Sequence, residues 1–350
     1  MVERQGWHLW SAKPGSIFWS RFVVYYYNYN ISVQPFGINI MYKKIIVVGS
    51  SNTDMVIKAD KLPLPGETVL GGEFFMNPGG KGANQAVTAA RLGGDVTFVT
   101  KIGNDIFGHQ ALQHFQREKI VTEYITIDAE HPSGVALINV DGKGENCIAV
   151  APGSNSQLKP TDVETALEMA DREAITLLQL EIPLPTVEYA IRKSYEKGFK
   201  VLLNPAPAQM LPADIFSLLY LITPNETEAE LLTGIRVIDT ATARQAAGKL
   251  QAVGVPNVVI TLGARGAYLH TESISGLMPP PPVTAIDTTA AGDCFNGALA
   301  VALAENRCLE EAVAFACKVA SVSVTRLGAQ SSIPYRQEVE TVPSPDFKQD

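Results

Sequence analysis

The feature of the sequence that most restricts its fold is an alternation, after Met41, of short apolar runs with longer helical patterns. The runs are rich in β-branched residues and bounded by polar residues, glycine or proline, as buried strands are. They cover 45–48, 96–100, 175–180, 200–203, 219–222 and 258–261. The helical patterns cover 83–92, 107–117, 161–170, 185–197, 226–232, 241–253, 291–305 and 310–325. This alternation predicts an α/β fold, with a doubly wound, Rossmann-like and mostly parallel sheet flanked by helices.

Two stretches, 55–75 and 134–150, interrupt the alternation because neither has a long helical period. The second contains Asp141-Gly142 between two apolar runs, which is a hairpin signal. A small β-sheet over the C-terminal edge of the main sheet, where ligands of open α/β sheets bind, would act as a lid. We therefore predict a β lid from about 52–76 and 134–151; an ordinary surface hairpin is the alternative.

The charge balance argues against several classes of protein. The chain has 28 Lys and Arg against 36 Asp and Glu, a net charge of −8, and so lacks the positive field that attracts nucleic acid. It has no uninterrupted apolar run of about 18 residues, the length that a membrane-spanning helix needs. Four cysteines without a C-x-x-C pair favour reduced thiols and a cytoplasmic location.

The first forty residues differ from the rest. They hold ten of the chain's 27 Phe, Tyr and Trp residues, three basic residues and a single acid, with no helical or alternating period. We expect an extension outside the folded domain, with organelle targeting as the alternative. The predicted domain then covers 41–340 and is followed by a flexible tail at 341–350.

The most informative motif is the segment 287–293, DTTAAGD, which follows a strand-like run at 283–286 and opens a long apolar helix. Small residues before a helix leave its first N–H groups free to hold an anion, with help from the helix dipole. Beside such an anion, Asp293 could accept a proton from an attacking hydroxyl. The alternative is that Asp293 is only a favourable acid in the first turn of the helix.

Two further segments suit a polyol. The turn 77–85, NPGGKGANQ, lacks the Lys-Ser/Thr ending of a Walker loop, but its glycines permit close approach of a ligand, and Asn84 can bind hydroxyls. Asn52 and Asp54 follow the first strand and point the same way in an extended chain. A carboxylate and an amide together can bind several hydroxyls. Ordinary turns are the alternative in both places.

Two segments suit a nucleotide. In 223–228, Glu228 stands three residues after Asn225, the spacing of a helix capping box, and its other possible role is to organise water around Mg²⁺. The segment 261–266 is a glycine-rich turn after a strand. Alone, each is weak support for a nucleotide site.

Taken together and in this order, the segments resemble the PfkB carbohydrate kinase family over about 43–333. The sequences GGKGANQA at 79–86 and DTTAAGD at 287–293 are similar to its two signatures. TPNETEAE at 223–230 and NPAPA at 204–208 are similar to the members that phosphorylate ribose. The resemblance implies ATP-dependent phosphorylation of D-ribose at O5, with Asp293 as general base.

The resemblance also implies the site residues. The sugar would be bound by Asn52, Asp54, Gly80, Lys81, Asn84, Glu181 and Asp293. ATP would be bordered by Asn225, Thr261, Gly263, Gly266, Gly292 and Cys317, although Cys317 replaces a His or Asn that is common in the family. The anion hole would consist of N–H groups of Ala290, Ala291 and Gly292, next to Asp293.

The implied cofactors are Mg²⁺, brought with ATP and contacted through water by Glu228, and a monovalent cation, usually K⁺. The K⁺ ligands, mostly backbone carbonyls, would come from Asp287, Thr289, Ser323, Arg326, Gly328 and Ser332. We expect K⁺ to order the anion-binding turn without contacting substrate.

Three alternatives remain. The acceptor could be fructose, deoxyribose or a nucleoside, although Asn52 with Asp54 favours a free sugar. The protein could be a non-catalytic sugar-binding homologue, against which the Gly292-Asp293 pair argues. A nicotinamide-dependent oxidoreductase is disfavoured because 49–52 lacks the spaced glycines of such a site. The expected partners are ribose, ATP and a second copy bound through the apolar lid, with neither nucleic acid nor a membrane.

Overall fold

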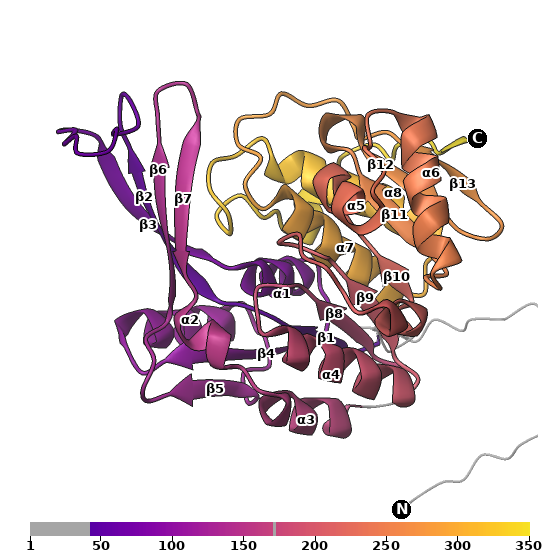
Figure 1. Ribbon diagram of the computed structural model, residues 1–350, viewed down its shortest axis with the longest axis horizontal. Helices are drawn as coiled ribbons and strands as arrows, with labels where there is room; N and C mark the ends of the chain where they lie inside the picture. The colour runs from indigo at the N-terminus through magenta and orange to yellow at the C-terminus, as the bar shows by residue number, and fades with distance from the viewer. Residues whose placement is uncertain (1–42, 171–172) are drawn as a thin grey trace, which may run out of the picture. The chain divides into compact units, whose positions relative to one another are not determined.

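The computed structural model describes residues 43–170 and 173–350, and the residues from Tyr42 onward form one compact unit (Figure 1). The predictions of an extension or a targeting segment at 1–40 concern residues outside this described part.

The main sheet of the described chain has ten strands in the order β14-β13-β12-β11-β10-β9-β8-β1-β4-β5. All neighbours from β11 to β5 pair in parallel. These strands are β1 (Ile45–Val48), β4 (Val96–Gly103), β5 (Ile125–Asp128), β8 (Ile175–Leu178), β9 (Lys200–Leu203), β10 (Leu221–Ile222) and β11 (Val258–Thr261). The predicted mostly parallel sheet is confirmed.

Helices cover both faces of this sheet (Figure 1). One face carries α1 (Lys81–Arg91), α2 (Ile106–Arg117), α7 (Ala291–Ala304) and α8 (Leu309–Ser323), together with α9 (Arg336–Glu340). The other carries α3 (Pro160–Met169), α4 (Leu184–Glu196), α5 (Glu226–Thr233) and α6 (Thr240–Ala252). Along β1, Ile45 and Val47 enter the first core and Ile46 and Val48 the second. Because both faces are buried, the strand reads as an unbroken apolar run.

Three antiparallel strands extend one edge of the sheet: β12 (Ala267–His270), β13 (Ser275–Met278) and β14 (Lys348–Gln349). This corrects the prediction of a flexible tail at 341–350. Leu277 pairs with Lys348, and the Tyr268 hydroxyl donates to the carboxylate of Asp350. The unpaired backbone of β13 is the physical reason, since an open strand edge favours pairing with another segment.

The strand-like run predicted at 283–286 is a second correction, because the structure has no strand there. The chain leaves β13 through four consecutive prolines, 279–282, which have no N–H to donate to a sheet. The run instead lies beside the end of α8, where the N–H groups of Ile286 and Asp287 donate to the carbonyl of Val324.

A separate four-stranded sheet in the order β3-β2-β6-β7 stands away from the helices (Figure 1). Its strands are β2 (Asn52–Lys58), β3 (Glu73–Gly79), β6 (Gly134–Val140) and β7 (Asn146–Ala151). Asp141-Gly142 turns the chain between β6 and β7, as predicted. Because β2 begins four residues after β1 ends, this sheet, which we call the lid, starts at the C-terminal edge of the parallel strands.

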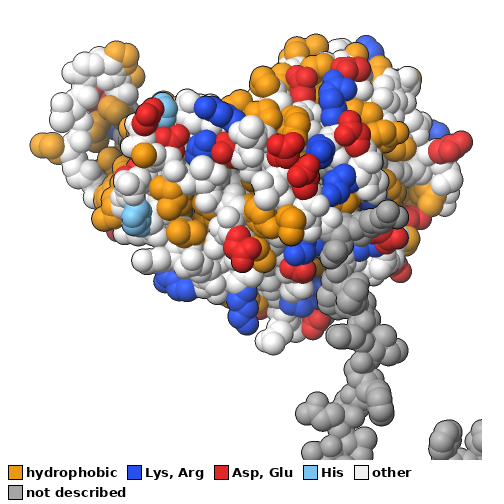
Figure 2. Space-filling view, turned by 90° about the horizontal axis from the view of Figure 1, so that it is seen from below, with side chains coloured by type: hydrophobic (Ala, Val, Ile, Leu, Met, Phe, Trp, Pro, Cys, Tyr) orange, Lys and Arg blue, Asp and Glu red, His pale blue; other side chains and the backbone are white. Residues whose placement is uncertain are grey.

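The remaining helices are short: η1 (Gly153–Gln157), η2 (Ala213–Leu218) and η3 (Gly263–Arg265). No helix in the described ranges has the length and apolar character to cross a membrane. Cys147, Cys294, Cys308 and Cys317 are all free thiols. On the face shown in Figure 2, basic and acidic side chains are interspersed.

Candidate active site

The turn from β3 into α1 places the first group of site residues. Gly80 has φ 90°, a conformation that other residues adopt only with strain, and a Cβ there would lie 2.8 Å from the Asn52 nitrogen. At Gly79, a Cβ would lie 2.2 Å from a carboxylate oxygen of Asp54. The glycines therefore let the turn lie directly against β2, and Asp54 lies over the start of α1.

Asp293, in the first turn of α7, is the centre of the site. Its side chain is only 7% exposed. One carboxylate oxygen accepts from Asn84 Nδ2 and the other from Gln85 Nε2, each at 2.9 Å. Burial raises the pKa of the Asp293 carboxyl, while the Lys81 charge and the two amide donors oppose the rise. A carboxylate with a raised pKa is a better proton acceptor than an ordinary one.

Asn84 is the predicted sugar ligand nearest to Asp293. Because its Nδ2 donates to Asp293, its Oδ1 points elsewhere, and that oxygen is buried without a partner among the described residues. Buried acceptors are normally paired. The unpaired oxygen is therefore suited to accept a hydrogen bond from a substrate hydroxyl.

Lys81 lies among four carboxylates. Burial alone would lower the pKa of Lys81, but the charges of Asp293, Glu181, Glu228 and Asp54 outweigh burial and leave the pKa above its ordinary value. Lys81 is thus a cation that four acids share. Its backbone N–H also donates to Glu181 Oε2 at 3.0 Å, and the hydroxyl of Ser50 donates to the same oxygen at 2.6 Å. These contacts bring Glu181, which follows β8, to the start of α1.

Asp54 lies on the lid at the same cluster. Burial first, and then the neighbouring charges of Glu181 and Asp293, together raise the pKa of Asp54 to about 6, against the opposing charge of Lys81. Asn52 occupies the same face of β2, and its Oδ1 accepts from Asn155 Nδ2 at 2.7 Å. The structure therefore places the predicted sugar residues together, although they come from β2, α1, the end of β8 and α7.

The N-terminus of α7 supplies free N–H groups, with one difference from the prediction. Among the described residues, the N–H groups of Gly292 and Asp293 have no acceptor, and Gly292 is exposed. Ala291, however, donates to the carbonyl of Thr288 at 3.2 Å. The reason is the turn made by Ala290, whose φ is 59°, which folds the chain back before the helix. The N–H of Ala290 also has no acceptor among the described residues, so Ala291 is the one predicted donor that is used within the protein.

The predicted nucleotide side lies at the ends of β10 and β11. Asn225 and Thr261 form a parallel bridge, and η3 places Gly263 and Gly266 directly beyond Thr261. Glu228 forms the predicted capping box: its Oε2 accepts from the Asn225 N–H and its own N–H donates to Asn225 Oδ1, both at 2.8 Å. Burial raises the pKa of Glu228, and Lys81 and Asp293 lie close enough to influence it. Glu228 therefore faces the cluster from the nucleotide side.

Cys317 is not among the residues that the structure brings to this site. Its side chain is buried in the core between α8 and the sheet, 3.9 Å from the carbonyl of Met278, and burial raises the pKa of the thiol to about 12. The prediction that it borders ATP therefore has no support from its position.

The predicted cation ligands come from two loops that Asp287 joins. Its carboxylate accepts from the Gly328 N–H at 2.8 Å and from the N–H and hydroxyl of Thr289 at 2.8 and 2.6 Å. In the described part of the chain, the carbonyls of Thr289, Arg326 and Gly328 accept no hydrogen bond. Free carbonyl oxygens are the ligands of K⁺ sites in proteins. The hydroxyls of Ser323 and Ser332 donate to the carbonyls of Ala320 and Ala329, and the Ser323 carbonyl accepts from the Arg326 N–H at 3.1 Å.

Sequence reasoning missed several residues that hold this site. Ser50 and Asn155 bind Glu181 and Asn52, while Gln85, Gln179 and Asn204 form a buried amide chain next to Asp293. Three of them were within reach, because Ser50, Gln85 and Asn204 belong to motifs already singled out. Gln179 and Asn155 lie in no such motif.

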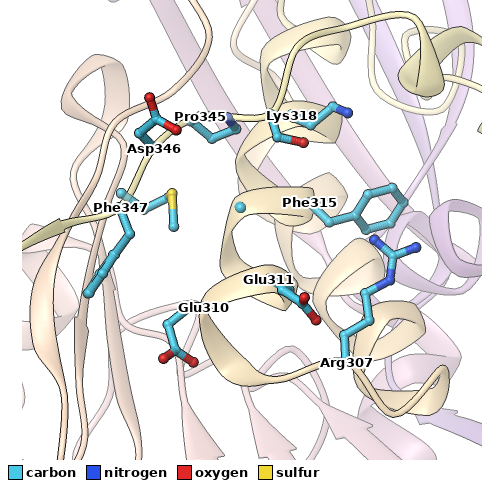
Figure 3. A pocket seen from close by; sticks show the side chains of 11 residues that line it. Arg307, Glu310, Glu311, Phe315, Lys318, Pro345, Asp346 and Phe347 are labelled. Atoms are coloured by element: carbon cyan, nitrogen blue, oxygen red, sulfur yellow. The ribbon is translucent and has the colours of Figure 1, made fainter.

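Of two pockets in the described structure, one lies away from this cluster and the other borders it at Asn52. One, of about 520 Å³, lies between the first turns of α8 and the segment before β14 (Figure 3), and no predicted site residue lines it. Its labelled charges, Arg307, Glu310, Glu311, Lys318 and Asp346, are of both signs. The other, of about 440 Å³, lies between the base of the lid and α2 and includes Asn52 and Gly79 in its wall.

The chain is similar to known proteins in both sequence and structure. A family model described as pfkB family carbohydrate kinase matches residues 42–336. The ribokinase of Haemophilus influenzae is 45% identical over 298 residues, which cover 85% of this chain and 97% of that protein.

Two solved structures are similar to this chain. The ribokinase of Thermotoga maritima gives a TM-score of 0.78 at 43% identity and covers 85% of this chain and 98% of its own. The ribokinase of Arabidopsis thaliana, solved with ribose and ATP, gives 0.77 at 30% identity and covers 86% and 98%.

Proposed function

The chain belongs to the pfkB family of carbohydrate kinases, and from that premise we propose how the cluster around Asp293 phosphorylates a sugar. The reaction is the ATP-dependent phosphorylation of ribose, the activity that the names of its relatives describe. The observation that carries the proposal is the buried carboxylate of Asp293 beside the free N–H groups of Gly292 and Asp293.

In this mechanism O5 of ribose loses its proton to Asp293 as it forms a bond to the terminal phosphorus of ATP. The bond between that phosphorus and the bridging oxygen breaks, and ADP leaves. General-base catalysis of this kind contributes about 10²–10⁴ in rate. The N–H groups of Gly292 and Asp293, at the positive end of α7, stabilise charge on the transferred phosphoryl oxygens, each by about 10²–10³.

The sugar is held by the groups that surround Asp293. Asn84 Oδ1 accepts from one hydroxyl, and the carboxylates of Asp54 and Glu181 accept from others. Asn52, Gly80 and Lys81 complete the sugar site. Because Asn52 and Asp54 belong to the lid, the lid closes over bound ribose and excludes water, which would otherwise compete as acceptor.

ATP lies along Asn225, Thr261, Gly263 and Gly266, with its terminal phosphate toward Gly292. Mg²⁺ bound with ATP would neutralise charge on its phosphates. Glu228 fits a water-mediated contact to that ion, because only its Oε2 is used by the capping box. The direct ligands of that ion would come from the ATP phosphates and water, and Glu228 would act through the water.

The two loops that Asp287 joins would hold a monovalent cation, K⁺, which would activate the enzyme. The free carbonyls of Thr289, Arg326 and Gly328 fit such an ion. The cation loop continues directly into the turn before α7, so order in one promotes order in the other. The bound cation would thus order the turn before α7 without contacting substrate.

The enzyme is a homodimer through the outer face of the lid. The register of the lid sheet places Met55 opposite Met76 and Leu137, and Ile57 opposite Phe74, on the face that Asp54 does not share. Ile57, Phe74, Met76 and Leu137 are exposed. A second copy that covers this apolar face removes it from water.

We place the enzyme in the cytoplasm, where four free cysteines stay reduced. An organelle is the alternative location if residues 1–40 act as a targeting segment. Fractionation of cells that express either the full chain or a chain starting at Met41 distinguishes the two locations.

The test of the proposed function is an ATP-consumption assay with ribose, deoxyribose, fructose and adenosine, with and without K⁺. We expect the highest kcat/KM for ribose and a higher rate with K⁺. A higher kcat/KM for any other acceptor would replace ribose as the substrate, and no turnover with any of them would leave a sugar-binding protein.

A further inference from the structure

A chain of three buried amides leads from the core to Asp293. Gln85 Nε2 donates to Asp293 Oδ1 at 2.9 Å and to Asn204 Oδ1 at 3.0 Å, and Gln179 Nε2 donates to Gln85 Oε1 at 2.6 Å. Gln85 and Gln179 are fully buried and Asn204 is 7% exposed. None of the three has been given a role in the reaction so far.

The direction of this chain is fixed by the backbone. Asn204 Nδ2 donates to the carbonyl of Thr223 at 3.3 Å. A carbonyl can only accept, so Asn204 must turn its Oδ1 toward Gln85, and Gln85 must turn its NH₂ group toward Asn204. The same NH₂ group then faces Asp293. Gln85 therefore offers Asp293 a donor and never an acceptor.

The chain of amides also contains an unfavourable feature, which a contribution to folding stability alone does not explain. With its NH₂ group toward Asp293, Gln85 must accept from Gln179, and Gln179 Oε1 is left buried without a donor among the described residues. Leaving a buried acceptor unpaired is unfavourable. A Cβ at Gly49 would lie 2.0 Å from that oxygen, so the glycine provides the space that the amide needs.

We propose that Gln85 is a positioning residue for the reaction: held in one orientation by Asn204, it keeps Asp293 in its carboxylate form and aims it at the acceptor hydroxyl. Burial pushes the Asp293 carboxyl toward the protonated form, and Gln85 and Asn84 oppose it. Asn84 is also placed to bind the sugar, whereas Gln85 is fully buried and its hydrogen bonds go only to Asp293, Asn204 and Gln179.

The inference rests on the proposed role of Asp293 as base, and it is tested by the pH profile of kcat at saturating ribose and MgATP. The variant Gln85→Met keeps the length of the side chain but removes the donor. A hydrogen bond to a charged group corresponds to about one to two pH units, so the acid limb of the profile moves upward by that amount. We expect kcat below the limb to fall about tenfold, with KM for ribose and ATP changed less than about threefold.

The matched control is Thr176→Val, which removes another fully buried polar contact, the 2.8 Å bond between Thr176 and Ser194, away from Asp293. It lowers the melting temperature without moving the acid limb. If Gln85→Met is insoluble, Asn204→Leu is the substitute test. It removes the acceptor that fixes the orientation of Gln85, so the acid limb of the pH profile should also move upward.

An acid limb that stays at its wild-type pH in folded Gln85→Met, or that moves equally in Thr176→Val, overturns the inference. An Asp293→Asn variant with near-normal turnover would instead remove the proposed function beneath it, so the two failures are distinguishable.

Discussion

Asn84 Nδ2 lies 2.9 Å from a carboxylate oxygen of Asp293, although 209 positions separate the two residues in the chain. The contact joins the first turn of α1 to the first turn of α7, and it leaves Asn84 Oδ1 free for a substrate hydroxyl. In the proposed mechanism, Asn84 therefore both binds the sugar and holds Asp293, the residue that takes its proton.

Replacing Asp293 tests the chemical step directly. Asp293→Asn keeps the shape of the side chain but cannot take a proton, so kcat should fall by at least about 10²-fold. Binding of ribose and ATP, measured by calorimetry, should remain within a few-fold of wild type. Turnover close to wild type would show that another group takes the proton.

Replacing Asp54 tests the sugar site. Asp54→Ala removes acceptors on the lid side of the cluster, and loss of hydrogen bonds to a charged group should raise the KM for ribose by about 10- to 100-fold. The KM for ATP should change far less in the same steady-state measurements. Asp141→Ala, in the hairpin of the same lid, is the control and should leave both constants unchanged. A larger effect on ATP would mean that the two substrate pockets are exchanged.

The same aspartate should make stability depend on pH. In the folded protein burial raises the pKa of Asp54 to about 6 from an ordinary value of 3.8, so its ionisation opposes folding. That cost grows as the pH rises from about 4 to about 6 and is fully present at pH 7.5.

Asp54→Asn should therefore raise the melting temperature at pH 7.5 by about 2–6 °C, while it weakens ribose binding. Thermal unfolding of the ligand-free proteins measures this, and the gain should shrink toward pH 5. A gain that is the same at both pH values would mean that the charge of Asp54 is not its cause.

Asp287→Ala should remove activation by K⁺. The substitution deletes the acceptor that joins Thr289 to Gly328, so the carbonyls that would hold the ion separate. In a titration with KCl at constant ionic strength, the wild-type rate should rise several-fold, and the variant should stay low and flat. Asp239→Ala, which removes an aspartate that caps α6, should keep the wild-type response.

Substitutions that introduce charged residues on the outer face of the lid should convert the proposed dimer into monomers. Phe74→Asp combined with Leu137→Asp places two carboxylates on the apolar face, and light scattering should then give the mass of one chain. Phe75 lies next to Phe74 but on the opposite face, so Phe75→Asp should remain dimeric. Equal masses for the two variants would exclude this face as the interface.

The fold could be predicted where periodicity is strong. Every predicted helix is present within two residues of its expected ends, because their apolar patterns are strong: α8 has many buried positions, and α7 is buried on all sides from Asp293 onward. The antiparallel edge was not predictable in this way. β14 has two residues and exists only because β13 offers an open edge, which no local pattern encodes.

The site was predictable where a residue stands in a motif. Asp54, Lys81 and Asp293, from the singled-out motifs, lie together with Glu181, which only the family resemblance implied. The influence of the acids and Lys81 on one another's pKa follows from that proximity. The amides behind them were not predicted as a group, because Gln85, Gln179 and Asn204 meet only when β8, β9 and α1 pack together. Cys317 was assigned to the ATP border only through the family resemblance, and its side chain is buried in the core beside α8.

The way β2 leaves the parallel sheet has a mechanical consequence. Asn155 clamps the start of the strand by binding both Ser51 and Asn52. If the four lid strands rotate as a rigid body about Asn52, the displacement of each residue is proportional to its distance from Asn52 along β2, at about 3.3 Å per residue. Lys58 then travels about three times as far as Asp54. Leu70 is 91% exposed in the connection beyond β2. A fluorophore attached there would therefore be displaced much more by lid rotation than Asn52 and Asp54 are.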